Sequence, residues 1–250
     1  MEVCIDSPDS AQNAEKGGAT RVELCANLME GGTTPSIGML KIIKNLLSIP
    51  VFVMIRPRGG DFCYSWTELQ VMKEDIICLR EAGADGFVFG LLTSDGDVDE
   101  SGCAELLGLC HPLPTTFHRA IDMSRDIFDS LAKIIQLGFI RVLSSGGCQT
   151  AHQGAQVLKD MVCQVKDKII VMPGGGITVD NLKDILLTTK AKEFHGSARK
   201  IVKSSVTYMN SHVCMGHIPE CEYIRKVTSS GQVSLFLRIA RSCWDAQVAE

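Results

Sequence analysis

The sequence predicts a single-domain α/β protein of the (β/α)8 TIM-barrel type. Eight short apolar runs recur along the chain, and successive runs start about 20–35 residues apart, a spacing typical of repeated units. Helix-compatible segments fill the gaps between the runs, and no change of composition divides the 250 residues. A closed barrel commonly reaches this length as one domain. The alternative is an open, doubly wound sheet.

Each run has the length and composition of a strand that is buried on both faces. Glycines end the helices before the second, fourth and sixth runs, whereas Pro50 and Pro114 precede the third and fifth. The predicted strands are Glu2–Ile5, Arg21–Cys25, Val51–Ile55, Gly86–Phe89, Thr115–His118, Arg141–Ser144, Ile169–Met172 and Glu193–His195. The predicted helices between them are Ser10–Lys16, Ile37–Leu47, Ser65–Ala82, Ser101–Cys110, Phe128–Leu137, Ala151–Val165 and Val179–Leu187.

The C-terminal part is longer than closure of a barrel requires. The eight β/α units occupy residues 1–196, and residues 197–231 are predicted to form a long loop over the barrel mouth or at a subunit contact. A capping box at Ser229–Gln232 precedes apolar residues at helical spacing, so residues 232–249 are predicted to form a closing helix. The whole chain, 1–250, is then one domain.

Composition excludes several classes of protein. A net charge of −4 with dispersed basic residues gives no surface for nucleic acid, and no apolar run approaches the roughly 20 residues of a membrane span. The N-terminus has no secretory pattern. The eleven cysteines are odd in number and contain no CxxC pair, which favours free thiols in a reducing compartment, most of them buried in the core.

Polar residues occupy positions of the predicted strands that point into the barrel. Side chains alternate along a strand, and the branched apolar set must face the helices. The inward set then contains charged residues, with Glu2 and Arg21 able to pair near the closed end. Buried charges are costly unless they are paired, so the interior holds either a self-contained ion-pair network or a ligand site at the open end.

The third run ends in the sequence RPRGGDF, which places two guanidinium groups and a carboxylate after a buried strand. Residues at the carboxyl ends of barrel strands form the active sites of such folds. The candidates for catalysis or ligand binding are Glu23, Arg56, Arg58, Asp61, His118, Asp122 and His195, which suit general acid/base work or hard-metal ligation. No lysine ends a strand, which argues against Schiff-base chemistry.

Two cysteines are candidate metal ligands. The first two strands are neighbours, so Cys4 and Cys25 are expected to project into the barrel side by side. Two thiolates at that spacing suit Cu(I), and Cys63 is a candidate third sulfur. Zinc requires four ligands, which no fixed spacing supplies. Inert, buried cysteines are the alternative explanation of the pair.

The seventh strand ends in a three-glycine turn, Gly174–Gly176, followed at once by a predicted helix, and the eighth ends near Ser197. The loops after these two strands hold phosphate in many barrels through backbone N–H groups. Gly174, Gly175, Gly176 and Ser197 are therefore candidate anion-binding residues. A tight turn that needs positive φ is the other reading of the glycines.

The chain resembles the CutC copper homeostasis family, and in detail its animal members. The resemblance rests on Leu24-Cys25, Glu30–Ser36, Ile55–Phe62, Thr116–Ala120, Asp122-Met123 and Gly174–Ile177. It implies a TIM-type barrel, a cytoplasmic and also nuclear location, self-association, and Cu(I) binding at Cys4 and Cys25. The His195-Gly196-Ser197 segment departs from the pattern, in which a Cys or Ser commonly stands in the middle, so no sulfur ligand is available there.

Three hypotheses follow. The protein is an intracellular Cu(I)-binding protein with copper as cargo or cofactor, an enzyme acting on a small phosphorylated or anionic metabolite, or a scaffold that has lost catalysis. In the enzyme hypothesis, Glu23 or His118 moves a proton, and Arg56 and Arg58 neutralise charge.

Overall fold

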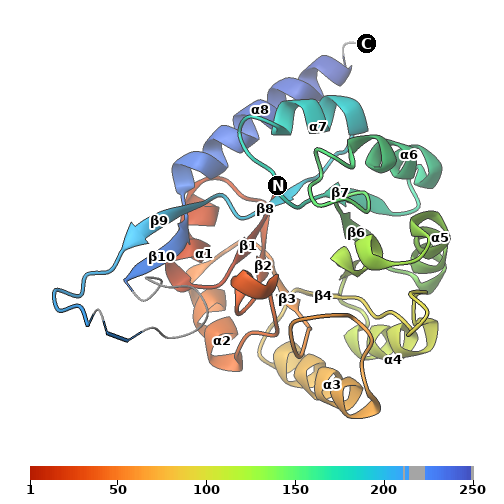
Figure 1. Ribbon diagram of the computed structural model, residues 1–250, viewed down its shortest axis with the longest axis horizontal. Coiled ribbons are helices and arrows are strands. Elements are labelled where there is room, and N and C mark those ends of the chain that lie inside the picture. Colours follow the sequence, from red (N-terminus) through yellow and green to blue (C-terminus); the bar gives the residue numbers. More distant parts are fainter. Residues whose placement is uncertain (211, 214–222, 249–250) are drawn as a thin grey trace.

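Eight parallel strands form one sheet that curls into a barrel, with helices around its outside (Figure 1). The computed structural model describes residues 1–210, 212–213 and 223–248. The strand order is β7-β6-β5-β4-β3-β2-β1-β8, so neighbours in the sheet are neighbours in sequence except at the β1–β8 pair. This order is that of a (β/α)8 barrel and confirms the predicted fold class.

The elements follow the predicted alternation closely. The barrel strands are β1 (Glu2–Ile5), β2 (Arg21–Leu24), β3 (Val51–Met54), β4 (Gly86–Phe89), β5 (Thr115–Phe117), β6 (Arg141–Ser144), β7 (Ile170–Pro173) and β8 (His195–Gly196). The helices are α1 (Pro8–Lys16), α2 (Ile37–Leu46), α3 (Trp66–Glu81), α4 (Glu100–Cys110), α5 (Ile127–Leu137), α6 (Ala155–Val165), α7 (Leu182–Thr189) and α8 (Ser230–Val248). Two 3-10 turns, η1 (Leu28–Glu30) and η2 (Arg119–Met123), follow β2 and β5.

The seam between β7 and β8 has no hydrogen-bonded ladder among the described residues. Gly174 follows β7 at this seam, and its backbone N–H donates to the carbonyl of Ser144. A Cβ at Gly174 would lie 2.5 Å from Leu143 Cδ1 and 3.1 Å from His195 Cβ. Glycine here therefore permits the close approach that completes the barrel.

Side-chain caps explain where several helices start. Ser7, Ser36, Asp99 and Asp126 each accept a hydrogen bond from a backbone N–H in the first turn of the helix that follows. Ser65 and Glu68 form a reciprocal capping box at α3. Helix α7 lacks such a cap and starts at Leu182, later than the predicted Val179.

Replacing Ser65 by alanine is expected to lower the free energy of unfolding by about 1 kcal/mol. The change removes the oxygen that accepts from the N–H of Glu68 and leaves that group without its cap. Urea denaturation monitored by circular dichroism measures the loss. Ser101→Ala, an exposed change inside the first turn of α4, is the matched control and should stay close to wild type. Equal loss in both variants would contradict the cap argument.

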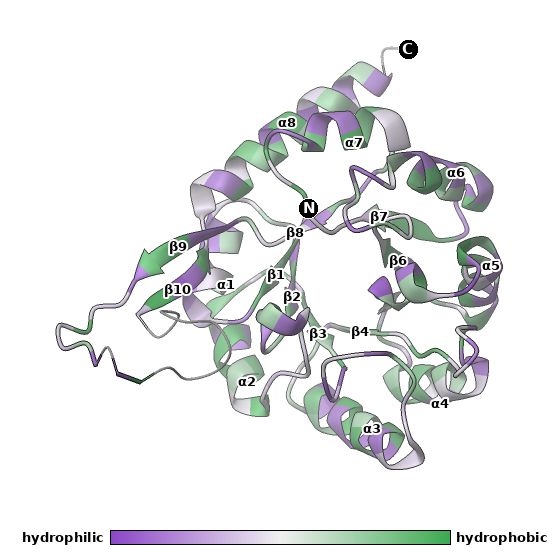
Figure 2. Ribbon diagram, viewed as in Figure 1, coloured by the Kyte–Doolittle hydropathy of each residue, from purple (hydrophilic) through white to green (hydrophobic). Residues whose placement is uncertain are grey.

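The segment predicted as a long loop, residues 197–231, contains two strands in its described part. Strands β9 (Arg199–Lys203) and β10 (Ile224–Thr228) pair antiparallel and form a ribbon that extends away from the barrel (Figure 1). Hydrophobic and hydrophilic residues both occur along it (Figure 2). Strand β10 packs against α1, where the N–H of Thr228 donates to Ser10 Oγ over 3.2 Å. The remaining part of the predicted loop, residue 211 and residues 214–222, lies outside the described residues.

Helix α8 begins at Ser230, two residues before the predicted start, and packs against α7 and α1. Phe194, just before β8, contacts Phe236 and Trp244 of α8 with ring centroids 6.4 Å apart in each pair. Trp244 Nε1 donates to the carbonyl of Ala191 over 3.0 Å. These contacts hold the last strand, which carries His195, against the outer helix layer. Residue 249, the predicted end of the helix, is outside the described residues.

The apolar core lies mainly between the sheet and the helices. Phe87, Phe89 and Phe117 are fully buried there. A separate, smaller apolar cluster fills part of the barrel interior and contains Cys25, Phe52, Met54 and Val88. The rest of the interior is polar, as the alternation of the strands predicts.

Candidate functional site

A cavity of about 490 Å³ opens at the carboxyl ends of the barrel strands. Residues from or after seven of the eight strands line it, including Cys4, Glu23, Arg56, His118 and His195. Ligand sites of barrel enzymes lie at this end, and pockets for small molecules have volumes of about 300–1,000 Å³. Arg56, His118 and His195 all line this one cavity.

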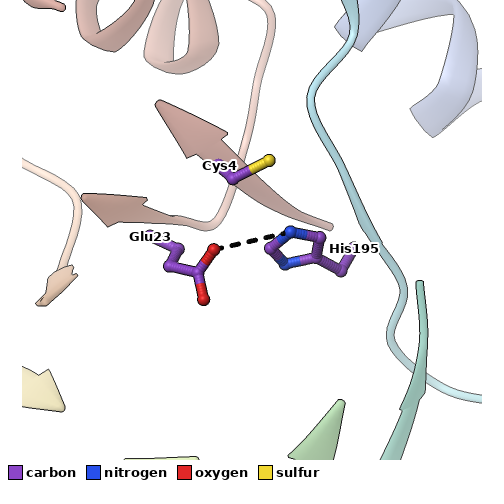
Figure 3. A group of neighbouring side chains, drawn as sticks. All are labelled: Cys4, Glu23 and His195. Carbon is purple, nitrogen blue, oxygen red and sulfur yellow. Dashed lines mark ion pairs between the residues drawn. The ribbon is translucent and has the colours of Figure 1, made fainter. Parts of the chain in front are cut away.

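Three side chains on one wall of the cavity form a group that is able to hold a metal ion (Figure 3). They are Cys4 of β1, Glu23 of β2 and His195 of β8, and one donor atom from each lies within 4.8 Å of the others. The sheet register explains the group, because Cys4 pairs with Glu23 and Glu2 pairs with His195 in neighbouring parallel strands. The ion pair between Glu23 Oε2 and His195 Nε2 spans 3.6 Å.

The orientation of His195 is set from behind by Glu2. His195 Nδ1 lies 2.8 Å from Glu2 Oε1, so Nε2 faces Glu23 and Cys4. Burial lowers the pKa of His195, but the negative charge of Cys4 and Glu23 outweighs it and raises the pKa well above its usual value. A carboxylate that fixes one ring nitrogen and leaves the other free for a metal is common among metal-binding histidines.

Glu23 is held in an environment that disfavours its charge. Burial raises its pKa to about 7, although His195 acts in the opposite direction. Its Oε1 atom is buried and has no hydrogen-bond partner among the described residues. A buried carboxylate oxygen without a partner is costly, so Glu23 is a group that a cation or a proton donor would stabilise.

The structure does not place Cys25 where the sequence analysis expected it. Cys25 follows β2 and lies two residues beyond Glu23, which is the actual neighbour of Cys4. The Cys25 thiol is 3.5 Å from Glu23 Oε2, and burial raises its pKa well above the usual value. Adjacency of two strands does not by itself determine which residues pair. Cys63, the candidate third sulfur, is exposed and does not line the cavity.

Arg56 lines the cavity, but most of its donors serve the backbone. Its Nη1 donates to the carbonyls of Glu30 and Gly32, and its Nη2 donates to that of Gly60. The guanidinium also lies over the ring of Phe62, 5.0 Å from the centroid. Arg56 therefore holds the loops after β2 and β3 in place.

Arg58 and Asp61 are separated from Arg56 and do not line the cavity. Arg58 Nη2 pairs with Asp61 over 3.1 Å, its Nε pairs with Glu68 of α3, and the Asp61 side chain is 66% exposed. The loop turns its second arginine outward, so these two candidates belong to a surface ion-pair cluster and not to the site.

His118 lies deep in the cavity wall, packed 4.8 Å from the ring of Phe62. Its Nδ1 accepts a hydrogen bond from the N–H of Ala120 over 3.3 Å. Burial, together with the nearby charge of Arg56, lowers the pKa of His118 to about 3, so the ring is neutral near pH 7. The proton then sits on Nε2, which has no partner among the described residues.

Asp122 lines the cavity with its acceptors already occupied. It pairs with Arg119 over 2.8 Å and accepts from Ser144 Oγ and from the backbone N–H groups of Ser145 and Gly147. This pattern ties the turn after β5 to the loop after β6. Asp122 therefore positions Arg119, a cavity residue that the candidate set from the sequence omitted although it directly follows His118.

The glycine turn contributes in part to the cavity. Gly175, Gly176 and Ser197 line it, whereas Gly174 is buried in the seam described above. Gly175 and Gly176 have φ values of 99° and 68°, a left-handed conformation that glycine adopts at little cost. The predicted helix does not follow at once, because α7 starts only at Leu182. Its N-terminus is thus separated from the glycine turn.

An ion network fills the closed end of the barrel below the site. Arg21 pairs with Glu2, as predicted, and also with Glu193, which in turn pairs with Arg141 over 2.8 Å. Arg21 and Arg141 both lie over the ring of Phe52. The polar interior therefore consists of both arrangements that the sequence allowed, a network at the closed end and an open cavity above it.

Fold and site together define a (β/α)8-barrel protein with a ligand cavity and a thiol–imidazole–carboxylate group on its wall. Residues 1–200 match the model of the CutC family. The chain belongs to the CutC family.

Relatives in mammals and bacteria extend this match. The chain is 52% identical over 242 residues to the copper homeostasis protein cutC homolog of Mus musculus, covering 96% of this chain and 89% of the relative. It is 41% identical to a CutC protein of Vibrio vulnificus over 235 residues, 93% of this chain and 94% of the relative.

Solved structures agree with the fold. A crystal structure of a CutC protein from Streptococcus agalactiae has a TM-score of 0.75 at 37% identity and covers 78% of this chain and 97% of its own. Thiamine phosphate pyrophosphorylase from Pyrococcus furiosus, with a TM-score of 0.59 at 14% identity over 97% of this chain and 95% of its own, shares the fold alone. Among the described residues, no helix has the length and apolar character needed to cross a bilayer.

Proposed function

We propose that this protein acts in copper homeostasis by binding a copper ion at the group formed by Cys4, Glu23 and His195. The observation that carries the proposal is the convergence of a thiol, an imidazole and a carboxylate within 4.8 Å in a chain of the CutC family. Thiolate and imidazole ligands suit copper, whereas carboxylates alone favour harder ions.

The donor set also indicates which ligands matter most for Cu(I). Cys4 supplies the soft sulfur and His195 Nε2 the nitrogen, so these two are the primary ligands in the proposal. Glu23 stands beside them with an unpartnered oxygen that a bound cation would satisfy. Cys25 lies behind Glu23, at 3.5 Å from its Oε2, and serves as a second sulfur only after Glu23 moves aside.

Anaerobic titration of the reduced protein with Cu(I), in competition with a chromophoric Cu(I) chelator, tests the proposal. We expect one tightly bound ion per chain. Cys4→Ser should weaken binding by about tenfold or more, since it removes the thiolate ligand. Cys25→Ser should weaken it much less, and Cys63→Ser, which changes an exposed thiol outside the cavity, is the matched control.

X-ray absorption of the copper-loaded protein should show sulfur and nitrogen ligands. Unchanged affinity in Cys4→Ser would rule out this site. Stronger loss in Cys25→Ser than in Cys4→Ser would instead restore the two-cysteine arrangement that the sequence suggested. Preference for Zn²⁺ over Cu(I) would move the proposal to a different metal.

A second candidate function is an enzyme that acts on a small anionic metabolite by general acid/base chemistry. Its support is that two buried groups with displaced pKa values in opposite directions line one cavity. Glu23 is shifted up to about 7 and His118 down to about 3. Such pairs of titratable groups are typical of acid/base sites. Arg58 has no place in this version, because it lies outside the cavity.

Self-association and a cytoplasmic or nuclear location complete the proposal, and both rest on the family resemblance. Light scattering coupled to gel filtration tests the first of these. A monomer at micromolar concentration would contradict it.

A further inference from the structure

Arg56 is a buried cation without an ion-pair partner among the described residues. Its residue is 5% exposed, and no carboxylate oxygen of the described residues lies within 4 Å of its guanidinium nitrogens. Its hydrogen-bond acceptors are three backbone carbonyls, and its Nε has none. Buried charges in proteins are almost always paired with an opposite charge. The cavity that Arg56 lines is the place from which a counter-ion reaches it.

His118 adds a donor without an acceptor next to this cation. The residue is 3% exposed and lines the same cavity. Its Nδ1 accepts from the backbone N–H of Ala120, so the neutral ring carries its proton on the unpartnered Nε2. Buried N–H groups in proteins nearly always have a hydrogen-bond acceptor, and an oxygen of a ligand in the cavity would supply one here.

Arg119 supplies a second guanidinium at the same cavity. Its Nε pairs with Asp122, and its Nη2 donates to Ser145 Oγ over 2.7 Å. Its Nη1 has no acceptor among the described residues, and the side chain is 40% exposed. Asp122 holds this guanidinium in place, so one of its edges remains free for a ligand.

We propose that the cavity binds a small organic anion whose carboxylate or phosphate group accepts from His118 Nε2 and from Arg119, with Arg56 compensating its charge. The remainder of the ligand extends toward Cys4, Glu23 and His195 on the other wall. A cavity of about 490 Å³ accommodates a metabolite and is much larger than a single ion requires. Its apolar lining, which includes Leu28, Met54 and Leu143, suits a carbon skeleton.

This inference rests on the second candidate function, an enzyme that acts on a small anionic metabolite. It does not depend on copper binding. It also differs from the site expected at the glycine turn. The anion is assigned to the loops after β3 and β5, where the unpartnered groups lie, instead of the loops after β7 and β8.

Isothermal titration calorimetry of the metal-free protein with inorganic phosphate, and separately with malonate, tests the assignment. We expect saturable binding of at least one probe, and the stronger of the two identifies the anionic group. His118→Asn keeps an oxygen that caps Ala120 but removes Nε2, and should weaken binding about tenfold or more. Arg119→Gln should do the same.

Arg58→Gln is the matched control, because Arg58 also pairs with an aspartate three residues later but lies outside the cavity. It should change the affinity by less than about twofold. NMR of the histidine side chains gives a local readout, since the anion should shift the Nε2 signal of His118 and slow exchange of its proton.

Absence of binding by both probes to the folded protein overturns the inference, as does full affinity in His118→Asn or an equal loss in Arg58→Gln. The Cys4→Ser variant separates this result from the copper proposal. It should weaken copper binding and leave the affinity for inorganic phosphate unchanged, because the proposal assigns that probe to His118 and Arg119, so failure of one proposal leaves the other intact.

Discussion

Replacing Arg21 by methionine is expected to lower the free energy of unfolding by about 3–5 kcal/mol, because it removes one partner of a buried ion network. Arg21 pairs with both Glu2 and Glu193, and the Glu2 side chain has no exposed surface. Without the guanidinium, Glu2 remains a buried carboxylate whose remaining ion-pair partner among the described residues is His195. Urea denaturation monitored by fluorescence or circular dichroism measures the change.

The matched control is Arg58→Met, which also removes an arginine that pairs with two carboxylates. Arg58 lies near the surface, where ion pairs contribute about 0–1 kcal/mol. The triple variant Glu2→Gln/Arg21→Met/Glu193→Gln should recover much of the lost stability, because no charge is then left unpaired. An Arg21→Met protein as stable as Arg58→Met would show that the network is not coupled to folding.

The ion network around Arg21 shows which features of the barrel interior can be predicted from the sequence. Alternation along β1 and β2 puts Glu2 and Arg21 on one face, and their pairing needs only that the two strands be neighbours at that register. The fold class is predictable for a similar reason, since eight repeated units with buried strands have few ways to close. Both predictions, the ion pair and the fold class, follow from the order and alternation of residues and need no interatomic distance.

The predicted pair of cysteines, in contrast, depends on which residues lie opposite each other on β1 and β2. Cys4 and Cys25 do lie on neighbouring strands, but Cys4 pairs with Glu23, and Cys25 is two residues further along. A shift of two residues keeps both side chains on the inner face while changing the composition of the site from two thiols to a thiol and a carboxylate. The Glu2–Arg21 pair already implies this register, because Cys4 and Glu23 lie two residues beyond Glu2 and Arg21 on their strands.

The conformations of the loops could not be predicted from the sequence either. The RPRGGDF stretch places Arg56 inward and Arg58 outward because Arg58 finds Glu68 on α3 and Asp61 on its own loop. The ribbon of β9 and β10 pairs residues more than twenty positions apart in a segment without clear periodicity. Arg119 lies in a short 3-10 turn, pairs there with Asp122 and lines the cavity. The positions of these residues depend on partners that are distant in the sequence and on the backbone angles of turns. The pattern of hydrophobic residues predicts neither.

Glu23 is the residue where stability and function are most clearly in conflict. Its folded-state pKa of about 7 lies above the ordinary value of 4.5, so the native state binds the extra proton more tightly than the unfolded chain. The contribution of this group to stability is therefore complete below pH 4.5 and is lost as the pH rises to about 7. At neutral pH the protein holds a carboxylate that folding disfavours.

Glu23→Gln is accordingly expected to stabilise the protein above pH 7 by about 2 kcal/mol while it weakens copper binding. The rise of the Glu23 pKa from 4.5 to about 7 corresponds to about 3 kcal/mol of unfolding free energy. Part of this stabilisation is offset in the variant, because His195 loses its interaction with the negative charge of Glu23. Urea denaturation at pH 5 and pH 8 measures the change, which should be small at pH 5 and larger at pH 8. Glu105→Gln, an exposed change on α4, is the control and should show no such dependence on pH.

A destabilised Glu23→Gln protein at pH 8 would mean that the carboxylate is retained for packing or hydrogen bonding. The expected outcome, greater stability with weaker metal binding, would mean that the buried charge is maintained against folding for its ligand. Residues that bind ligands commonly carry such a cost, because a site preformed for a cation must hold negative charge before the cation arrives. Among the three described carboxylates that line the cavity, Glu23 has the buried oxygen without a partner, whereas Asp122 is satisfied by backbone and side-chain donors and Glu30 is exposed.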